Sequence, residues 1–179
     1  MNKKSFQQGD LHFSIVLVLH FAFYILHFAF CILHFAFCIL HFPNMIYGIG
    51  TDIIEVSRIE KVMERDIGFR DKIFTPGEIA YCETKKHKFE NYAARFSAKE
   101  AFLKAIGTGW RFGIRFADIE VYHDELGKPF INATGKAKEL LADLSISKIH
   151  VSLSHLKELA TAIVILECEI ANPNVQEPF

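Results

Sequence analysis

Charge is missing from a long stretch of this 179-residue chain: residues 11–42 contain no Asp, Glu, Lys or Arg. The whole chain also lacks a basic excess, with 20 Lys and Arg side chains against 21 Asp and Glu. This balance argues against a general nucleic-acid binder. The four cysteines form no Cys-x-x-Cys pair and no zinc-ligand spacing. That excludes a disulfide framework and predicts a reducing, cytoplasmic location.

The uncharged stretch consists largely of a seven-residue repeat. The unit Leu-His-Phe-Ala-Phe-Cys-Ile, with Tyr for Cys in the first copy, begins at Leu19, Leu26 and Leu33 and restarts at Leu40. Its length suffices for a transmembrane helix, but a His in every unit is costly in a bilayer. A tandem DNA repeat upstream of a true start at Met45 would also produce this pattern. We expect residues 1–44 to reflect a misassigned start and expect no membrane partner, with a membrane-tethered form of the same protein as the alternative.

From Met45 the chain has the composition of an ordinary globular domain, which we predict over 45–167, followed by a frayed tail at 168–179. Helical periodicity predicts three helices, which span 57–68, 91–106 and 137–144. A fourth, shorter helix is predicted to start at the turn 75–78. Ser57 is the expected N-cap of the first, with Glu60 completing a capping box. Strands are predicted at 45–56, 118–123, 129–133, 147–153 and 159–167. Helices packed on a mainly antiparallel sheet make an α+β fold.

One carboxylate lies within the first predicted strand. Asp52 follows the segment Gly48-Ile-Gly50-Thr and precedes two isoleucines. A lone Gly-x-Gly is weak evidence for a phosphate loop, because the third glycine of the dinucleotide fingerprint is missing. Buried carboxylates are rare unless they are paired or bind a metal. Taken alone, Asp52 is either a turn residue or a metal ligand.

Two further segments carry polar candidates. Glu100 and Lys104 are four residues apart on the predicted helix 91–106, so they share one helix face. In isolation this pair is expected to be a solvent-exposed salt bridge that contributes little to the stability of the fold. His155 ends the segment His-Val-Ser-Leu-Ser-His at the mouth of a predicted hairpin. An exposed His there needs no function.

The combination of the three segments is more specific than any one of them. Gly-Ile-Gly-Thr-Asp-Ile, then Arg-Phe-Ser-Ala-Lys-Glu-Ala-Phe-Leu-Lys-Ala, then His-Val-Ser-Leu-Ser-His occur in this order. Phe116-x-Asp-Ile-Glu-Val and Gly127-Lys-Pro lie between the last two. From Met45 to Glu167 the chain resembles the holo-[acyl-carrier-protein] synthase family, the small 4′-phosphopantetheinyl transferases.

This resemblance implies a Mg²⁺-dependent enzyme. Members transfer 4′-phosphopantetheine from coenzyme A to a serine of an apo-acyl-carrier protein and release adenosine 3′,5′-bisphosphate. Asp52 and Glu100 match the family's metal ligands, and Glu100 and Lys104 its catalytic residues. Arg95 and His155 match positions that face the nucleotide end of coenzyme A. The family also implies a homotrimer with active sites between subunits.

A basic stripe on the first predicted helix suggests how the carrier protein docks. Arg58, Val62, Arg65, Phe69 and Lys72 follow spacings of four, three, four and three, so one continuous helix would align them. A solvated amphipathic face is the plain alternative. In related enzymes this helix meets the acidic carrier protein, so Arg58 and Arg65 are the predicted carrier-binding residues.

Two other functional classes stay open on sequence alone. A different Mg²⁺-dependent phosphoryl enzyme, such as a nuclease, would also use paired carboxylates, but two-metal sites usually need more acids. A membrane-tethered binding module would account for residues 11–42 and leave the three motifs unexplained.

Overall fold

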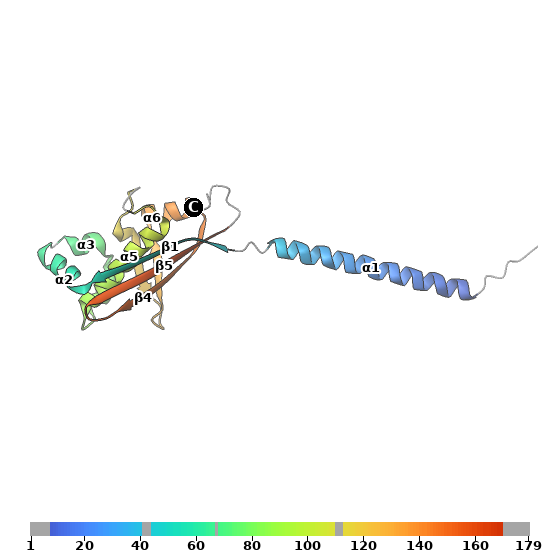
Figure 1. Cartoon of the computed structure of the whole chain (residues 1–179), viewed down its shortest axis with the longest axis horizontal. Helices are drawn as coiled ribbons and strands as arrows, with labels where there is room; N and C mark the ends of the chain where they lie inside the picture. The colour runs from blue at the N-terminus through green and yellow to red at the C-terminus, as the bar shows by residue number, and fades with distance from the viewer. Residues whose placement is uncertain (1–7, 41–43, 67, 110–112, 170–179) are drawn as a thin grey trace, which may run out of the picture. The chain divides into compact units, whose positions relative to one another are not determined.

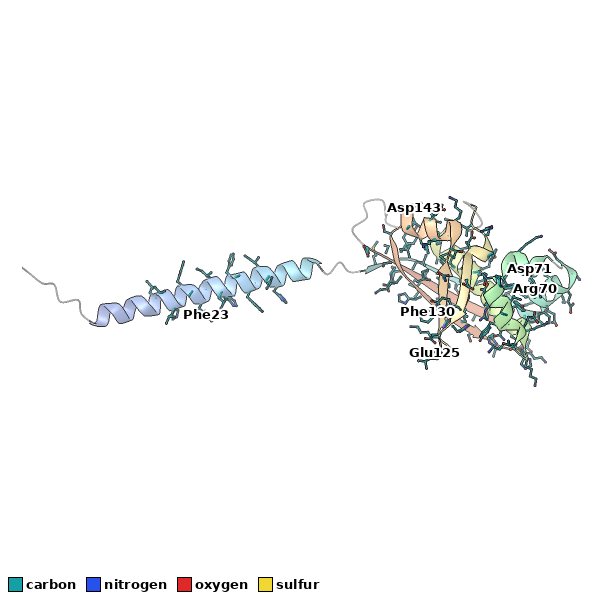
Figure 2. All side chains as sticks on the ribbon, turned by 180° about the vertical axis from the view of Figure 1, so that it is seen from behind. Phe23, Arg70, Asp71, Glu125, Phe130 and Asp143 are labelled. Atoms are coloured by element: carbon teal, nitrogen blue, oxygen red, sulfur yellow. The ribbon has the colours of Figure 1, made fainter. Side chains whose placement is uncertain are left out.

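The described N-terminal part of the chain, residues 8–40, is a single helix. The computed structural model describes residues 8–40, 44–66, 68–109 and 113–169. It divides into two compact units, Met1–Phe42 and Pro43–Phe179. In the first unit, helix α1 runs from Gln8 to Leu40 (Figure 1). Its described side chains, Phe23 among them, project on both sides of the ribbon (Figure 2).

Helix α1 satisfies the length and composition of a membrane span. Its window Leu17–His34 has a mean hydropathy of 1.9, and none of it is buried. Phe23 stacks on His27 and Phe30 stacks on His34, in each case four residues apart on the helix. The described part of the repeat therefore forms regular helix, and its apolar side chains from Leu17 to His34 are all exposed.

The second unit is built on antiparallel strands. Strands β1 (Asn44–Glu55), β5 (Leu159–Glu169) and β4 (Ile146–His155) form a three-stranded sheet in that order. Strands β2 (Ile119–His123) and β3 (Pro129–Ala133) pair separately as a hairpin. The predicted tail is partly wrong, because Cys168 and Glu169 continue β5; residues 170–179 lie outside the described residues. The α+β class predicted from the sequence is confirmed.

Helix α5 (Lys88–Ile106) packs across one face of the three-stranded sheet (Figure 1). It begins three residues before the predicted start and ends, as predicted, at a left-handed Gly107 with φ 81°. Much of the core lies between this helix and the sheet, where Phe102, Val164 and Leu166 are fully buried. This helix and strand β1 carry most of the polar candidates.

The glycines of the Gly-x-Gly segment allow β1 to lie directly on α5. A Cβ atom at Gly48 would stand 2.1 Å from the carbonyl oxygen of Ala105. One at Gly50 would stand 1.9 Å from the carbonyl oxygen of Ala101. Real Cβ atoms essentially never approach another atom closer than 3.0 Å. The two glycines therefore serve close backbone packing, which explains them without a phosphate loop.

The shorter helices surround this centre. They are α2 (Val56–Arg65), α3 (Phe69–Ile73), α4 (Pro76–Glu83) and α6 (Gly135–Asp143), with a 3-10 turn at Phe116–Asp118. The predicted capping box at Ser57 and Glu60 is wrong, because α2 starts at Val56 with Glu55 as N-cap and no side-chain cap. The backbone N–H of Val56 donates to the carbonyl of Glu158 at 2.9 Å, and this tertiary bond fixes the earlier start.

The predicted continuous stripe on the first helix is also interrupted. Helix α2 ends at Arg65, and Phe69 and Lys72 belong to the separate helix α3. Phe69 packs on Phe96 of helix α5, with ring centroids 6.3 Å apart. Arg58 and Arg65 stay exposed on α2, and Lys61 is exposed between them. The basic surface of α2 is therefore Arg58, Lys61 and Arg65.

A buried ion pair joins α4 and α5. Lys99 and Glu78 are both inaccessible, and Lys99 Nζ donates to Glu78 Oε2 at 2.6 Å. It also donates to the carbonyls of Ile73 and Phe116, while Glu78 Oε1 accepts from the N–H of Val121. Burial lowers the pKa of Lys99, and the charge of Glu78 opposes that shift. All three ammonium hydrogens have acceptors, as a buried charge requires.

Among the described residues, three isoleucines on the sheet face opposite α5 are exposed. Ile49 and Ile53 of β1 are 61% and 64% exposed, and Ile163 of β5 is 47% exposed. The register pairs Ile163 with Thr51, between the two β1 isoleucines, so the three side chains share one face. A sheet face of this composition is typical of an interaction surface.

Candidate active site

Asp52 lies on the α5 side of strand β1. Its side chain follows Gly48 and Gly50 along the strand with a period of two, so it faces helix α5 as they do. Lys104 Nζ donates to Asp52 Oδ1 at 2.8 Å and to the carbonyl of Thr51 at 3.0 Å. The Asp52 side chain is 15% exposed and that of Lys104 is 51% exposed. The strand and the helix thus bring two predicted site residues together that are far apart in sequence.

Glu100 is placed beside this pair by helix geometry. It lies one turn before Lys104 on α5 and is partly buried. Ser97, one turn earlier on the helix than Ala101, donates its hydroxyl to the carbonyl of Asp52 at 2.8 Å. Asp52 therefore lies alongside the turn of α5 that carries Glu100. Two carboxylates from different elements, with a lysine, border one side of the helix.

This arrangement suits a hard divalent cation. Mg²⁺ is usually held by one or two carboxylates together with waters and substrate phosphates. Among the residues that the structure describes, no three His, Cys, Asp or Glu side chains cluster as a complete metal cage. The donor set of Asp52 and Glu100 fits an ion that takes its other ligands from the substrate. The ammonium of Lys104 already balances the Asp52 carboxylate.

His155 lies at a second polar cluster, at the end of β4. Its Nδ1 is 3.2 Å from Glu90 Oε2, and the Nδ1 of His87 is 3.7 Å from Glu90 Oε1. Glu90 also lines a cavity of about 380 Å³. The basic residues around that cavity are Lys85, Lys86, His87, Lys88 and Lys157. Sequence reasoning missed this basic rim, although the run Lys85-Lys-His-Lys was visible in the chain.

Arg95 is buried within the unit, at 2% exposure. Its guanidinium carbon is 4.1 Å from the centre of the Tyr81 ring, and one amino group is 3.2 Å from His123 Nδ1. Another donates to the carbonyl of Asn91. Within the described residues its Nε has no hydrogen-bond partner. Burial, reinforced by the charges of Arg95 and Lys85, lowers the pKa of His123, which favours a neutral ring that accepts from Arg95.

Comparison with known proteins identifies the family. The model of the ACPS family, described as the 4′-phosphopantetheinyl transferase superfamily, matches residues 48–164. The chain belongs to this superfamily. A holo-[acyl-carrier-protein] synthase of Geotalea daltonii is 48% identical over 124 residues, which make up 69% of this chain and 99% of the relative. The chain is thus an enzyme of the holo-[acyl-carrier-protein] synthase type, as its motifs predicted.

Solved synthase structures share the fold of the second unit. The enzyme from Neisseria meningitidis has a TM-score of 0.64 at 36% identity and covers 68% of this chain and 98% of its own. The Bacillus anthracis enzyme, solved in complex with coenzyme A (3′,5′-ADP), has a TM-score of 0.59 at 40% identity and covers 70% and 99%. These synthases match over nearly their full length, so the rest of this chain has no counterpart in them.

Proposed function

We propose that this synthase transfers 4′-phosphopantetheine from coenzyme A to a serine hydroxyl of an apo-acyl-carrier protein, with Mg²⁺, and releases adenosine 3′,5′-bisphosphate. Family membership supports the reaction class. The observation that carries the proposal is the meeting of Asp52 and Lys104 beside the helical turn of Glu100. Phosphoryl transfer depends mainly on positioning and on stabilising charge at the phosphate oxygens. Two acids and a lysine suit that task.

The protein's own groups have separable roles. Asp52 and Glu100 would hold Mg²⁺, which when bound neutralises charge on the pyrophosphate oxygens. Glu100 would also accept the proton of the attacking serine, directly or through a water. Lys104 is half exposed and has a flexible stem, so it can turn from Asp52 to the phosphates. There its ammonium group would neutralise the charge on the leaving phosphate or donate a proton to it.

The nucleotide end of coenzyme A would lie along α5 from this centre. Strand β1 runs three residues beyond Asp52 to Glu55, which corresponds to roughly 10 Å, and the next residue, Val56, lines the basic cavity. An extended cofactor can bridge that distance. We propose that His155 and the basic rim bind the 3′-phosphate. The unpartnered Nε of Arg95 supports a further acceptor near that residue.

A direct test removes each proposed metal ligand. Asp52→Ala or Glu100→Ala is expected to abolish most transfer, measured by the mass gain of an apo-carrier protein incubated with coenzyme A and Mg²⁺. Circular dichroism should show an intact fold, and extra Mg²⁺ should rescue little. Lys104→Ala should slow turnover more than it weakens coenzyme A binding. Near-normal turnover of Glu100→Ala would overturn the assignment. Glu139→Ala, at an exposed position on α6, is the matched control.

The basic surface of α2 is the proposed carrier-protein site. Arg58, Lys61 and Arg65 are exposed on one helix, and carrier proteins of this class are acidic. Arg58→Glu or Arg65→Glu should raise the KM for the carrier protein several-fold and weaken its salt dependence. The KM for coenzyme A should stay constant. A parallel rise of both constants would mean that these residues support the fold or the nucleotide pocket.

A homotrimer with shared sites is the proposed assembly. The exposed face of Ile49, Ile53 and Ile163 gives one unit an apolar surface suited to other copies. Ile163→Lys should lower the mass measured by light scattering and reduce transfer. Leu126→Lys, at a 95% exposed turn position of the hairpin, should change neither. A wild-type monomer at working concentration would exclude this assembly.

We also propose that the active unit begins at Met45 and works in the cytoplasm. Two observations support this start: the family model matches residues 48–164, and 124 residues of this chain match 99% of the Geotalea daltonii synthase. Cys82 and Cys168 are buried free thiols, which suits a reducing compartment.

A further inference from the structure

The carbonyl oxygen of Asp52 accepts two side-chain hydroxyls. Ser97 Oγ donates to it at 2.8 Å from helix α5, and Thr161 Oγ1 donates to it at 2.8 Å from strand β5. Ser97 is fully buried and Thr161 is partly buried. Both donors are therefore at least partly shielded from water, which would otherwise compete for the same bond.

The two hydroxyls approach from opposite faces of the sheet. Helix α5, which carries Ser97, covers the buried face. Thr161 alternates with the buried residues Ala160 and Ala162 and pairs with the exposed Ile53, so it belongs to the other face. Displacement of the Asp52 peptide toward either face would stretch one of the two bonds. The pair opposes movement of this peptide in both directions.

Strand β1 has a particular need for such support. It is an edge strand of the three-stranded sheet, hydrogen-bonded on one side to β5. Edge strands are held by one ladder only, and the glycines before Asp52 contribute no side chains of their own. A Mg²⁺ ligand must nevertheless be precise, because the ion demands near-octahedral geometry at about 2.0–2.1 Å.

We infer that Ser97 and Thr161 are positioning residues that fix the backbone of Asp52 for metal binding. This inference rests on the proposed function, in which Asp52 is a metal ligand. Neither hydroxyl touches the ion; each acts through the Asp52 carbonyl. Partners of this supporting kind typically change metal affinity by about 10–100-fold when they are removed. We expect a change in metal affinity at the lower end of this range, because the two hydroxyls act on the Asp52 carboxylate only through the backbone.

The test measures Mn²⁺ binding in the absence of turnover. Full-length protein with coenzyme A and no carrier protein is titrated with Mn²⁺, and free Mn²⁺ is followed by electron paramagnetic resonance. Ser97→Ala and Thr161→Val should each raise the Mn²⁺ dissociation constant about ten-fold. Thr161→Ser keeps the hydroxyl and should bind like the wild type. The matched control is Ser147→Ala, which removes a hydroxyl bond to the carbonyl of Glu167 elsewhere in the sheet.

The outcomes separate this inference from the proposed function. Unchanged Mn²⁺ affinity in folded Thr161→Val would refute the inference, and a lower Tm of that variant would then mean that the hydroxyls only stabilise the fold. If Ser97→Ala does not fold by circular dichroism, the comparison of Thr161→Val with Thr161→Ser decides alone. Asp52→Ala tests the metal assignment separately. Wild-type Mn²⁺ affinity in Asp52→Ala would refute that assignment itself, whatever the hydroxyl variants show.

Discussion

The contact of Gly50 with helix α5 leads to a quantitative prediction for Gly50→Ala. The new Cβ would stand 1.9 Å from the Ala101 carbonyl oxygen and 2.5 Å from the Ala105 nitrogen. Reaching the 3.0 Å that real Cβ atoms keep from other atoms requires β1 and α5 to separate by 1.1 Å. Both opposing atoms are backbone, so no side-chain rotation relieves the clash. We expect a loss of about 3 kcal/mol in the free energy of unfolding, the upper end for an overpacked interior.

The same displacement should reach the active site. Asp52 is two residues from Gly50, and its carbonyl lies 2.8 Å from Ser97 Oγ on α5. Hydroxyl hydrogen bonds extend to about 3.0 Å, so a shift of this size breaks the bond. A misplacement of about 1 Å can cost roughly 100-fold in rate. The rate of phosphopantetheine transfer by the folded fraction of Gly50→Ala should therefore fall by roughly 100-fold.

Urea unfolding and the carrier-protein mass assay measure the two effects. Gly68→Ala is the matched control, because Gly68 has ordinary helical angles of φ −84° and ψ −14° and its nearest atom would be 3.4 Å away. We expect the control to stay within about 0.5 kcal/mol of the wild type. If Gly50→Ala were as stable and active as the control, the close packing of β1 on α5 would be refuted.

Three further predictions concern other parts of the molecule. A chain that starts at Met45 should be soluble and fully active, and peptide mapping of the native protein should find no peptides from residues 1–44; loss of activity on truncation would show that the extension is needed. Lys99→Met leaves the Glu78 carboxylate buried and unpaired, so it should cost about 3–5 kcal/mol in urea unfolding, whereas exposed Lys138→Met should cost little. Because the pKa of His123 is lowered in the fold, the unfolded chain binds the proton first, and stability should fall as pH drops below about 6.5. His123→Gln should flatten that part of the urea-midpoint profile, and an unchanged slope would count against the buried neutral ring.

Much of the fold could be predicted from the sequence, because the clearest sequence patterns depend on local structure alone. Gly107 ends helix α5 as predicted, and the alternation in β2, β3, β4 and β5 gave the hairpins. The failures have a tertiary origin. Ser57-x-x-Glu60 and Thr75-x-x-Glu78 both match the capping-box pattern, yet the box forms only at Thr75, because a backbone bond to Glu158 draws the start of α2 to Val56.

The candidate site was only partly predictable for the same reason. The spacing of Glu100 and Lys104 follows from the helix alone, but the bond of Lys104 to Asp52 depends on how β1 crosses α5. Lys99 is charged like the adjacent Glu100 but is an interior residue, with a fully buried side chain. Sequence does not reveal which of these two adjacent charged side chains faces the core, because helix α5 is buried on several sides and shows no single apolar stripe.

The antiparallel crossing of β1 and α5 limits how this enzyme can be re-engineered. Gly48 meets Ala105, Gly50 meets Ala101, and Asp52 meets Ser97, so each step of two strand residues matches four helix residues. The two rises are nearly equal, about 6.7 Å and 6.0 Å. One residue inserted in α5 between Ser97 and Lys104 would turn the later part of the helix by about 100° and carry Lys104 away from Asp52. Length changes that alter substrate preference must therefore be made in the loops, where the spacing between these two elements is preserved.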